Sequence, residues 1–425
     1  MLKPSTVRIA LALSALMTAA CGQVDDGSLP LTIRSADDVA AYDGVVNRDG
    51  NLSIINTDIT ELSALASLTE VAGDVRLVNN TKRTSLAGLE QLEVIRGNLI
   101  IDGNTALTSL QGLNQLRRVE GIVFILGSDA LTTLAGLESL AYVGGLQICG
   151  NPILAKLHAL SSLATVEGTL ALSSNDAIET LAGLEGIEQL GGLKIMGNPI
   201  LSTLSHLGSV RLLERDVEIQ LNTMLSDLAF LQTVERIGGD LTLWGNPAIS
   251  SIGDLDSLES IGGTFLLWSM EGLVALDLLP SLQSVGGDLH FLQNPQLTQL
   301  EGLSNLESVE GDILIERHPL LQTVNLAPEL VRVGKAFTAS QNAQLTELRG
   351  FTRVAQLGAG FQLAFNAALV EVDLFGDVVQ LSSVLRIQSN ISLEACQVNA
   401  LADQFAFDES RVDVTIDSNL EGTCE

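Results

Sequence analysis

A glycine that recurs every 24 residues constrains the fold of this chain more than any other feature. Two runs of glycines keep the spacing without interruption: Gly73, Gly97, Gly121 and Gly145, and then Gly239, Gly263, Gly287 and Gly311. A unit of this length cannot bury its own apolar side, so successive units have to stack. The chain is therefore predicted to be a repeat protein whose units form the coils of a solenoid.

Each unit has the pattern of a short strand followed by a turn. After Gly97, the apolar Leu99 and Ile101 alternate with Ile100 and Asp102, which predicts a half-buried strand. An asparagine then follows at the same place in most units, where its side chain can turn the chain and bind backbone groups. These asparagines are expected to form an internal ladder from coil to coil: Asn80, Asn104, Asn151, Asn175, Asn198, Asn222, Asn246, Asn294, Asn342, Asn366 and Asn390. Aliphatic residues three apart complete each unit, and the predicted class is mainly β, a parallel solenoid.

The composition of the chain agrees with thin coils and excludes one class of partner. Apolar residues make up 46% of the sequence but aromatic residues only 4%, so leucine, isoleucine and valine are expected to fill the interior. The formal charge of −29 would repel the phosphate backbone, so no nucleic-acid partner is expected. The acidic residues are interpreted as a solvated surface, and neither a metal site nor a cofactor is predicted.

The N-terminus has the pattern of an export signal. Lys3 and Arg8 precede an apolar run over residues 9–17, which is too short to span a bilayer as a helix. Small residues then lead to Cys21, and this arrangement resembles the bacterial lipobox, in which the cysteine carries lipid. The resemblance implies a signal peptide over 1–20, lipidation at Cys21, an acidic tether over 21–33 and a place in the cell envelope, at the outer membrane. Ordinary secretion is the alternative.

Short helical caps are expected at both ends of the solenoid. Residues 34–49 are predicted to form the N-terminal cap, with Ser35 as the N-cap of a helix. Residues 393–425 are predicted to form the C-terminal cap, because the stretch from Leu393 breaks the glycine period and has helical spacing. A disulfide between Cys396 and Cys424 is expected there, since exported proteins meet an oxidising compartment.

The repeat resembles two known families. Leucine-rich repeats have similar leucine and asparagine spacing, but one stretch resembles the receptor L-domain more closely: Ser109-Leu110-Gln111-Gly112-Leu113-Asn114-Gln115-Leu116-Arg117-Arg118-Val119-Glu120-Gly121. The resemblance extends over residues 50–392 and implies a right-handed parallel β-helix, but it says nothing about a ligand. The chain lacks the cysteine-rich modules of receptor ectodomains, so a receptor-kinase role is not implied.

Candidate binding residues follow from the positions two and four residues before each ladder asparagine, which are expected to face solvent. The main candidate patch contains both tryptophans of the chain: Thr242, Trp244, Leu266, Trp268, His290 and Leu292. A weaker second patch contains Ile100, Ile122, Phe124 and Leu126. Exposed apolar patches mark interaction sites, and tryptophan is enriched in binding hot spots. The alternative interpretation is that stacked aromatic rings stabilise neighbouring strands. Cys149 falls at an outward position as well, where a half-covered, inert thiol is expected.

Three functions remain open at this point. The first is a non-enzymatic surface lipoprotein whose sheet face binds a protein or a polysaccharide and whose lipid enters the membrane. The second is a structural envelope component without a discrete ligand. The third, an enzyme acting on polysaccharide, is disfavoured because such β-helix sites need clustered acidic and basic side chains. After the signal segment the chain has only four lysines: Lys82, Lys156, Lys194 and Lys335.

Overall fold

The structure is a computed structural model that describes residues 32–33, 35–208, 210–276, 279–407, 412–417 and 419. The predicted signal peptide and Cys21 lie outside these residues, and so does Cys424. The chain divides into two compact units, the first ending at Leu201 with residues 206–208 added, and the second comprising residues 202–205 and 209–425. Both units are parallel β-solenoids, as the glycine period predicts.

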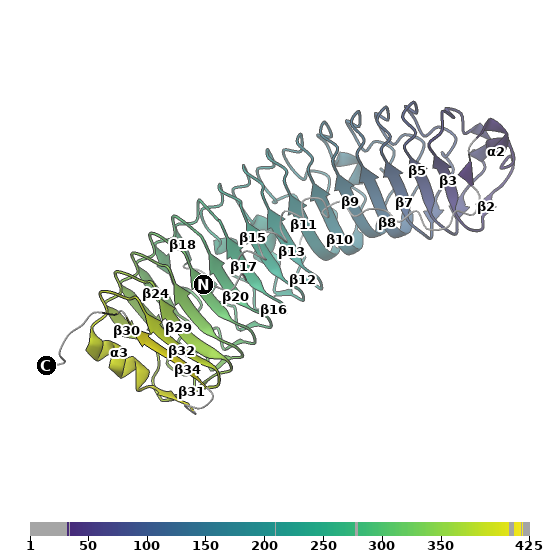
Figure 1. Ribbon diagram of the computed structural model, residues 1–425. Coiled ribbons are helices and arrows are strands. Elements are labelled where there is room, and N and C mark those ends of the chain that lie inside the picture. The colour runs from purple at the N-terminus through teal and green to yellow at the C-terminus, as the bar shows by residue number, and fades with distance from the viewer. Residues whose placement is uncertain are drawn as a thin grey trace. The chain divides into compact units, whose positions relative to one another are not determined.

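In the first unit, parallel strands lie side by side along one sheet (Figure 1). Its helical elements are α2 (Ala36–Ala40) and the short 3-10 turns η1 (Ser63–Leu65) and η2 (His158–Leu160). Its strands are β1 (Thr32–Ile33), β2 (Asn47–Arg48), β3 (Leu52–Ile55), β4 (Glu70–Val71), β5 (Val75–Val78), β6 (Val94–Ile95), β7 (Leu99–Asp102), β8 (Arg118–Leu126), β9 (Tyr142–Cys149), β10 (Thr165–Ser173) and β11 (Gln189–Met196).

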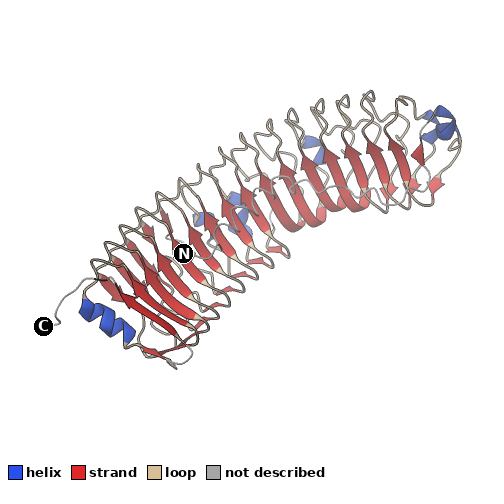
Figure 2. Cartoon of the chain, in the orientation of Figure 1, coloured by secondary structure: helices blue, strands red, loops and turns tan. Residues whose placement is uncertain are grey.

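The second unit repeats the same coil with its strands in three parallel sheets, and strands dominate it (Figure 2). Its main sheet contains β13 (Val217–Gln220), β15 (Leu241–Trp244), β17 (Phe265–Trp268), β20 (Leu289–Leu292), β23 (Ile313–Glu316), β26 (Phe337–Ser340), β29 (Gly360–Ala364), β32 (Val384–Gln388) and β34 (Asp413–Asp417).

Two further sheets cover the other sides of these coils. One contains β12 (Leu212–Leu213), β14 (Arg236–Ile237), β16 (Ser260–Ile261), β19 (Ser284–Val285), β22 (Ser308–Val309), β25 (Arg332–Val333), β28 (Gln356–Leu357), β31 (Val379–Leu381) and β33 (Phe405–Ala406). The other contains β18 (Ala275–Leu276), β21 (Gln299–Leu300), β24 (Thr323–Leu326), β27 (Glu347–Gly350) and β30 (Glu371–Asp373). The helical elements of the unit are η3 (Ala229–Thr233), η4 (Gly253–Leu255) and α3 (Ala395–Ala402).

The asparagine ladder that the sequence predicts is present in both units. Asn80 donates its backbone N–H to Oδ1 of Asn104 at 3.0 Å, and Asn104 in turn donates Nδ2 to the Leu77 carbonyl at 2.7 Å. Both asparagines are buried. Since a buried polar group without a partner costs about 1–3 kcal/mol, this chain of bonds is what allows amides inside an aliphatic core.

A second ladder, which the sequence analysis did not identify, follows the residue directly after the periodic glycine. In the first unit, Asp74 donates its backbone N–H to Oδ1 of Asn51, and Asn98 donates to Oδ1 of Asp74, both at 2.8 Å. In the second unit, Asp240 donates to Asp216 at 2.8 Å and Thr264 donates to Asp240 at 2.7 Å. Five aspartates therefore have a defined structural role as ladder acceptors and are not merely a solvated surface: Asp74, Asp216, Asp240, Asp288 and Asp312.

This second ladder also determines where strands break. Ile122 donates its N–H to Oδ1 of Asn98 at 2.8 Å but offers no side-chain acceptor to the next coil. The shorter β6 and β7 precede this position, whereas β8, which contains Ile122, runs unbroken for nine residues. Where no side chain accepts a bond from the next coil, the backbone N–H and C=O groups of β8 pair with the neighbouring strand instead, and the strand continues.

The interior differs from the expectation in one respect, because phenylalanine rings enter the core of the second unit. Phe265 and Phe291 meet edge to face with ring centroids 5.9 Å apart. Phe337 and Phe361 stack at 5.6 Å, and Phe361 also contacts Phe405 at 4.9 Å. The prediction that aliphatic side chains alone fill the coils is thus wrong for this part of the chain. Parallel coils place equivalent rings one above the other, which makes such aromatic columns favourable.

The predicted cap helices are both found, although the second is not a terminal lid. Ser35 and Asp38 form a reciprocal capping box at the start of α2. Helix α3 is followed by β33 and β34, which pair with β31 and β32. The C-terminal region from residue 393 therefore contains a further coil with α3 inserted in it. The asparagine ladder continues into that coil, since Asn390 donates its N–H to Oδ1 of Asn419 at 3.2 Å.

Candidate functional site

The six residues of the predicted main patch come together on the outward side of three neighbouring strands in the second unit. Trp244, Trp268 and Leu292 are in register on β15, β17 and β20. Thr242, Leu266 and His290 form the second column on the same strands. We call these six residues the tryptophan face. Because side chains alternate along a strand, the residues between them point into the core.

The two indole rings pack against each other. Their centroids are 5.2 Å apart and their planes differ by 19°. Trp268 also donates its Nε1–H to Oε1 of Gln293 at 2.7 Å. Parallel strands lie about 4.8 Å apart, so identical side chains in register on adjacent coils fall naturally into a stack.

Five residues of the tryptophan face are partly exposed, and one is not. Leu292 is only 6% exposed, so the expectation that it faces solvent is wrong. It lies in register between Trp268 and Glu316, whose side chains flank it on both sides. The exposed part of the face is therefore made by Trp244, Trp268 and Leu266, with Thr242 and His290 beside them.

The second predicted patch, in the first unit, is not a continuous exposed surface. Ile100 and Leu126 are buried, with 1% and 7% of their surface exposed, contrary to the prediction. Ile100 lies in register between Arg76 and Phe124, which flank it from the adjacent strands. Phe124 and Ile122 remain partly exposed.

The cysteine predictions have separate outcomes. Cys149 is 1% exposed, so it is buried more completely than its outward position predicts. Cys396 lies in α3, whereas Cys424 is outside the described residues. The disulfide between Cys396 and Cys424 therefore stays a prediction.

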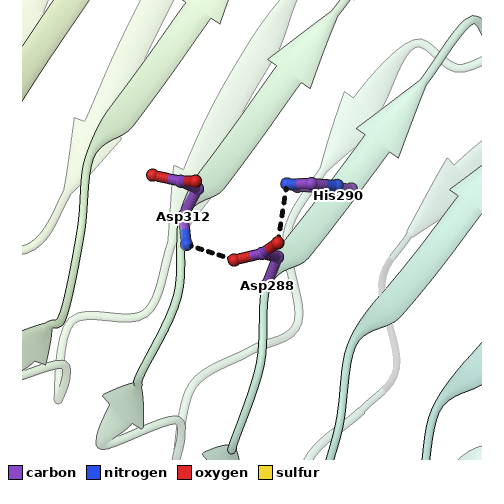
Figure 3. A group of neighbouring side chains, drawn as sticks. All are labelled: Asp288, His290 and Asp312. Atoms are coloured by element: carbon purple, nitrogen blue, oxygen red, sulfur yellow. Dashed lines mark hydrogen bonds and ion pairs between the residues drawn. The ribbon is translucent and has the colours of Figure 1, made fainter. Parts of the chain in front are cut away.

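Directly beside the tryptophan face lies a polar cluster that the sequence analysis did not find. It consists of Asp288, His290 and Asp312, and each offers a ligand atom within 4.8 Å of the other two (Figure 3). Within the described part of the chain this is the one such group able to hold a metal ion. His290 belongs to both surfaces, since its register partner on β17 is Leu266.

Lys335 forms ion pairs with both carboxylates of this cluster. Its Nζ lies 2.9 Å from Oδ1 of Asp288 and 3.9 Å from Oδ2 of Asp312. Burial alone would raise the pKa of Asp288, but hydrogen bonds from the Asp312 backbone and from Lys335 outweigh it, and the pKa is lowered. Burial lowers the pKa of His290, although Asp288 and Asp312 act against this shift. The neutral form of the His290 imidazole, which can bind a cation through Nε2, is thus favoured beside the Asp288 carboxylate.

No helix in the described part of the chain has both the length and the apolar character needed to cross a bilayer.

Comparison with known families matches one stretch of the chain. Residues 45–110 match the Receptor L domain family, which confirms the predicted resemblance over that stretch. A leucine-rich repeat protein from Bacteroides ovatus is among the similar solved structures, with 11% sequence identity and a TM-score of 0.27. That match covers 87% of this chain and 92% of the other. No curated protein matches the chain.

Proposed function

We propose that this chain is a non-enzymatic lipoprotein of the cell surface and that its tryptophan face binds another macromolecule of the envelope. In this proposal Cys21 carries the lipid that holds the protein in the outer membrane. The observation that supports binding is the placement of both tryptophans of the chain, stacked and partly exposed, on the outward side of a sheet. Tryptophan in the core would serve packing alone, whereas partly exposed tryptophan is enriched in binding hot spots.

The geometry of the stack favours a protein over a polysaccharide as the partner. A sugar ring binds tryptophan by lying flat on an exposed ring face. Here one face of each ring is used by the other ring, and the register neighbours beyond them are Gln220 and Leu292. The parts left accessible to a partner are the edges of the two indole rings and the adjoining Leu266. Such a surface suits the interdigitating side chains of a protein.

The alternative function, a structural envelope component without a ligand, is supported by a different observation. The tryptophan stack and the bond from Trp268 to Gln293 join the coils of β15, β17 and β20. Such cross-strand contacts contribute to stability whether or not a partner exists. The two functions differ in whether a saturable partner is found.

Binding of the chain from residue 22 onward to intact cells and to isolated envelope protein tests the proposal. We expect saturable binding that the Trp244→Ala/Trp268→Ala double variant weakens at least tenfold, because loss of a hot spot costs about 2 kcal/mol or more. The matched control is the Thr338→Ala/Gln362→Ala variant, which changes two outward residues of β26 and β29 in the same unit, in the column that also contains Leu266 and His290. Equal binding by both variants would contradict a role for the tryptophan face. Absence of any saturable binding by the unaltered chain would favour the structural role.

A further inference from the structure

We propose that Asp288, His290 and Asp312 bind one divalent transition-metal cation, for which Zn²⁺ is the matching probe. This site is independent of the tryptophan face in its chemistry, although it shares His290 with that face. The three side chains come from two consecutive coils, Asp288 and His290 at β20 and Asp312 just before β23, and they converge on one point (Figure 3).

The backbone holds both carboxylates in place. Oδ1 of Asp288 accepts the Asp312 N–H at 2.8 Å, and Oδ1 of Asp312 accepts the Ala336 N–H at 2.8 Å. These bonds belong to the second ladder, so the two carboxylates are fixed one coil apart. In each residue the second oxygen is left to face the cluster, and Oδ2 of Asp288 is the atom that lies 3.9 Å from Nε2 of His290.

The donor set selects the class of cation. One imidazole and two carboxylates suit Zn²⁺ and its neighbours in the first transition row, whereas Ca²⁺ takes six to eight oxygen ligands. Zinc bonds of about 2.0–2.2 Å require ligand atoms about 3.3 Å apart in a tetrahedral arrangement. The present atoms are within 4.8 Å of one another, so side-chain rotations that bring them closer by up to about 1.5 Å close the site. Three protein ligands leave a coordination position open to solvent.

Lys335 competes with a bound cation for the carboxylates of Asp288 and Asp312. Its ammonium pairs with Oδ1 of Asp288 and lies 3.9 Å from Oδ2 of Asp312, so it repels a cation held by the same carboxylates, but its side chain is 54% exposed. The ammonium can therefore move into solvent when a divalent cation enters. It follows that the affinity for the cation is lowered by Lys335 and should rise when this charge is removed.

Zinc titration of the purified protein by calorimetry tests the site, in a Cys149→Ser background so that the thiol does not bind zinc. We expect Lys335→Met to tighten zinc binding at least tenfold and His290→Ala to weaken it at least tenfold. Asp312→Asn should also weaken it tenfold, and this variant keeps the ladder acceptor because Asn98 makes the same bond in the first unit.

The matched control is Asp240→Asn, at the equivalent ladder position of a coil that has Thr242 where His290 stands. Its zinc affinity should equal that of the unaltered protein, and Ca²⁺ should not compete for the site. As a second readout, the imidazole nitrogen resonances of His290 should shift on zinc addition, while those of the buried His318 should not. The proposal is overturned if the unaltered protein and Lys335→Met both fail to bind zinc. It is equally overturned if His290→Ala binds zinc as tightly as the Asp240→Asn control.

Discussion

His318 accepts the backbone N–H of Asn294 through its Nδ1 at 3.1 Å, in the place where other coils use the Oδ1 of an asparagine. Its Nε2 lies 3.0 Å from the Phe291 carbonyl, so this nitrogen carries the proton of the neutral ring. The ring is fully buried, and burial lowers the pKa of His318 to about 4. An imidazole can thus replace the amide in the ladder only while it is uncharged.

Acid should therefore destabilise the second unit through His318. The folded pKa of about 4 lies below the ordinary value of 6.5, so the unfolded chain binds the proton more readily. Stability is unaffected above pH 6.5 and falls as the pH decreases from there to about 4, by about 3 kcal/mol for this group alone. Replacing His318 by Asn should remove this part of the loss. Urea unfolding of both proteins at pH 7.5 and pH 4, followed by tryptophan fluorescence, measures the difference. An equal pH dependence in both proteins would refute the prediction.

Removal of one ladder amide should be costly. Asn246→Ala takes away the acceptor of the Asn222 N–H at 3.0 Å and the donor to the Ile219 carbonyl at 2.7 Å. Two buried backbone groups are left without these partners, which should lower the free energy of unfolding by about 2–4 kcal/mol. The control is Asn305→Ala, which removes an exposed amide bond to the Pro280 carbonyl and should cost less than about 1 kcal/mol. Similar losses for both variants in chemical denaturation would argue against the ladder as a source of stability.

Close approach of the coils should make certain glycines irreplaceable. A Cβ at Gly191 would lie 2.1 Å from the carbonyl oxygen of Glu167, so the two coils would have to separate. We expect Gly191→Ala to lower stability by about 2–3 kcal/mol. Gly150 has a left-handed φ of +64° but open space around it, with its nearest atom at 3.9 Å. Gly150→Ala should therefore cost only about 1 kcal/mol in backbone strain. Thermal unfolding followed by circular dichroism compares the two within the first unit.

The tryptophan stack should have a spectroscopic signature. Only two tryptophans are present in the chain, and they are the two that pack at 5.2 Å. Their coupled transitions should give a circular dichroism couplet that disappears in Trp244→Phe and in Trp268→Phe alike. Each variant should also lose about 0.5–1.5 kcal/mol of ring-pair stabilisation. If the spectra of the two variants, summed and reduced by the spectrum of the Trp244→Phe/Trp268→Phe double variant, equal that of the unaltered protein, the rings are not stacked in solution.

The repeat made most of the fold predictable. A period of 24 residues fixes which residues lie above one another, so the strands, the inward aliphatic side chains and the asparagine ladder all followed from the sequence. Asn419 was not identified as a ladder residue. The insertion of α3 places it 29 residues after Asn390, so a search at a spacing of 24 residues does not find it. The division into two units lies where the periodic glycine is missing, since Arg215 stands at its place between Gly192 and Gly239, although the asparagines continue at their usual spacing.

The site was predictable only in part, because the exposure of a side chain depends on its register neighbours as well as on its place along the strand. The tryptophan face was found since both columns could be read from the period. The burial of Ile100, Leu126 and Leu292 was missed because neighbouring side chains on a parallel sheet cover one another, and alternation along a strand does not account for this. The cluster of Asp288, His290 and Asp312 could have been found. Asp288 and Asp312 each follow a periodic glycine, and His290 is two residues further, on the same face.

The second ladder implies a rule for how this chain can change in length. Each of its side chains binds the backbone of the next coil 23 or 24 residues further along, so both ladders stay in phase when about one whole coil is gained or lost. Deleting residues 240–263 would bring Asp216 next to Thr264 and preserve every kind of bond that the ladders contain. A coil can differ by one residue, since Asn175 still donates to Asn198 when they are 23 residues apart, but a larger partial deletion would put apolar side chains where acceptors are needed. Duplication of a whole coil is thus the step by which such a chain can grow while remaining folded.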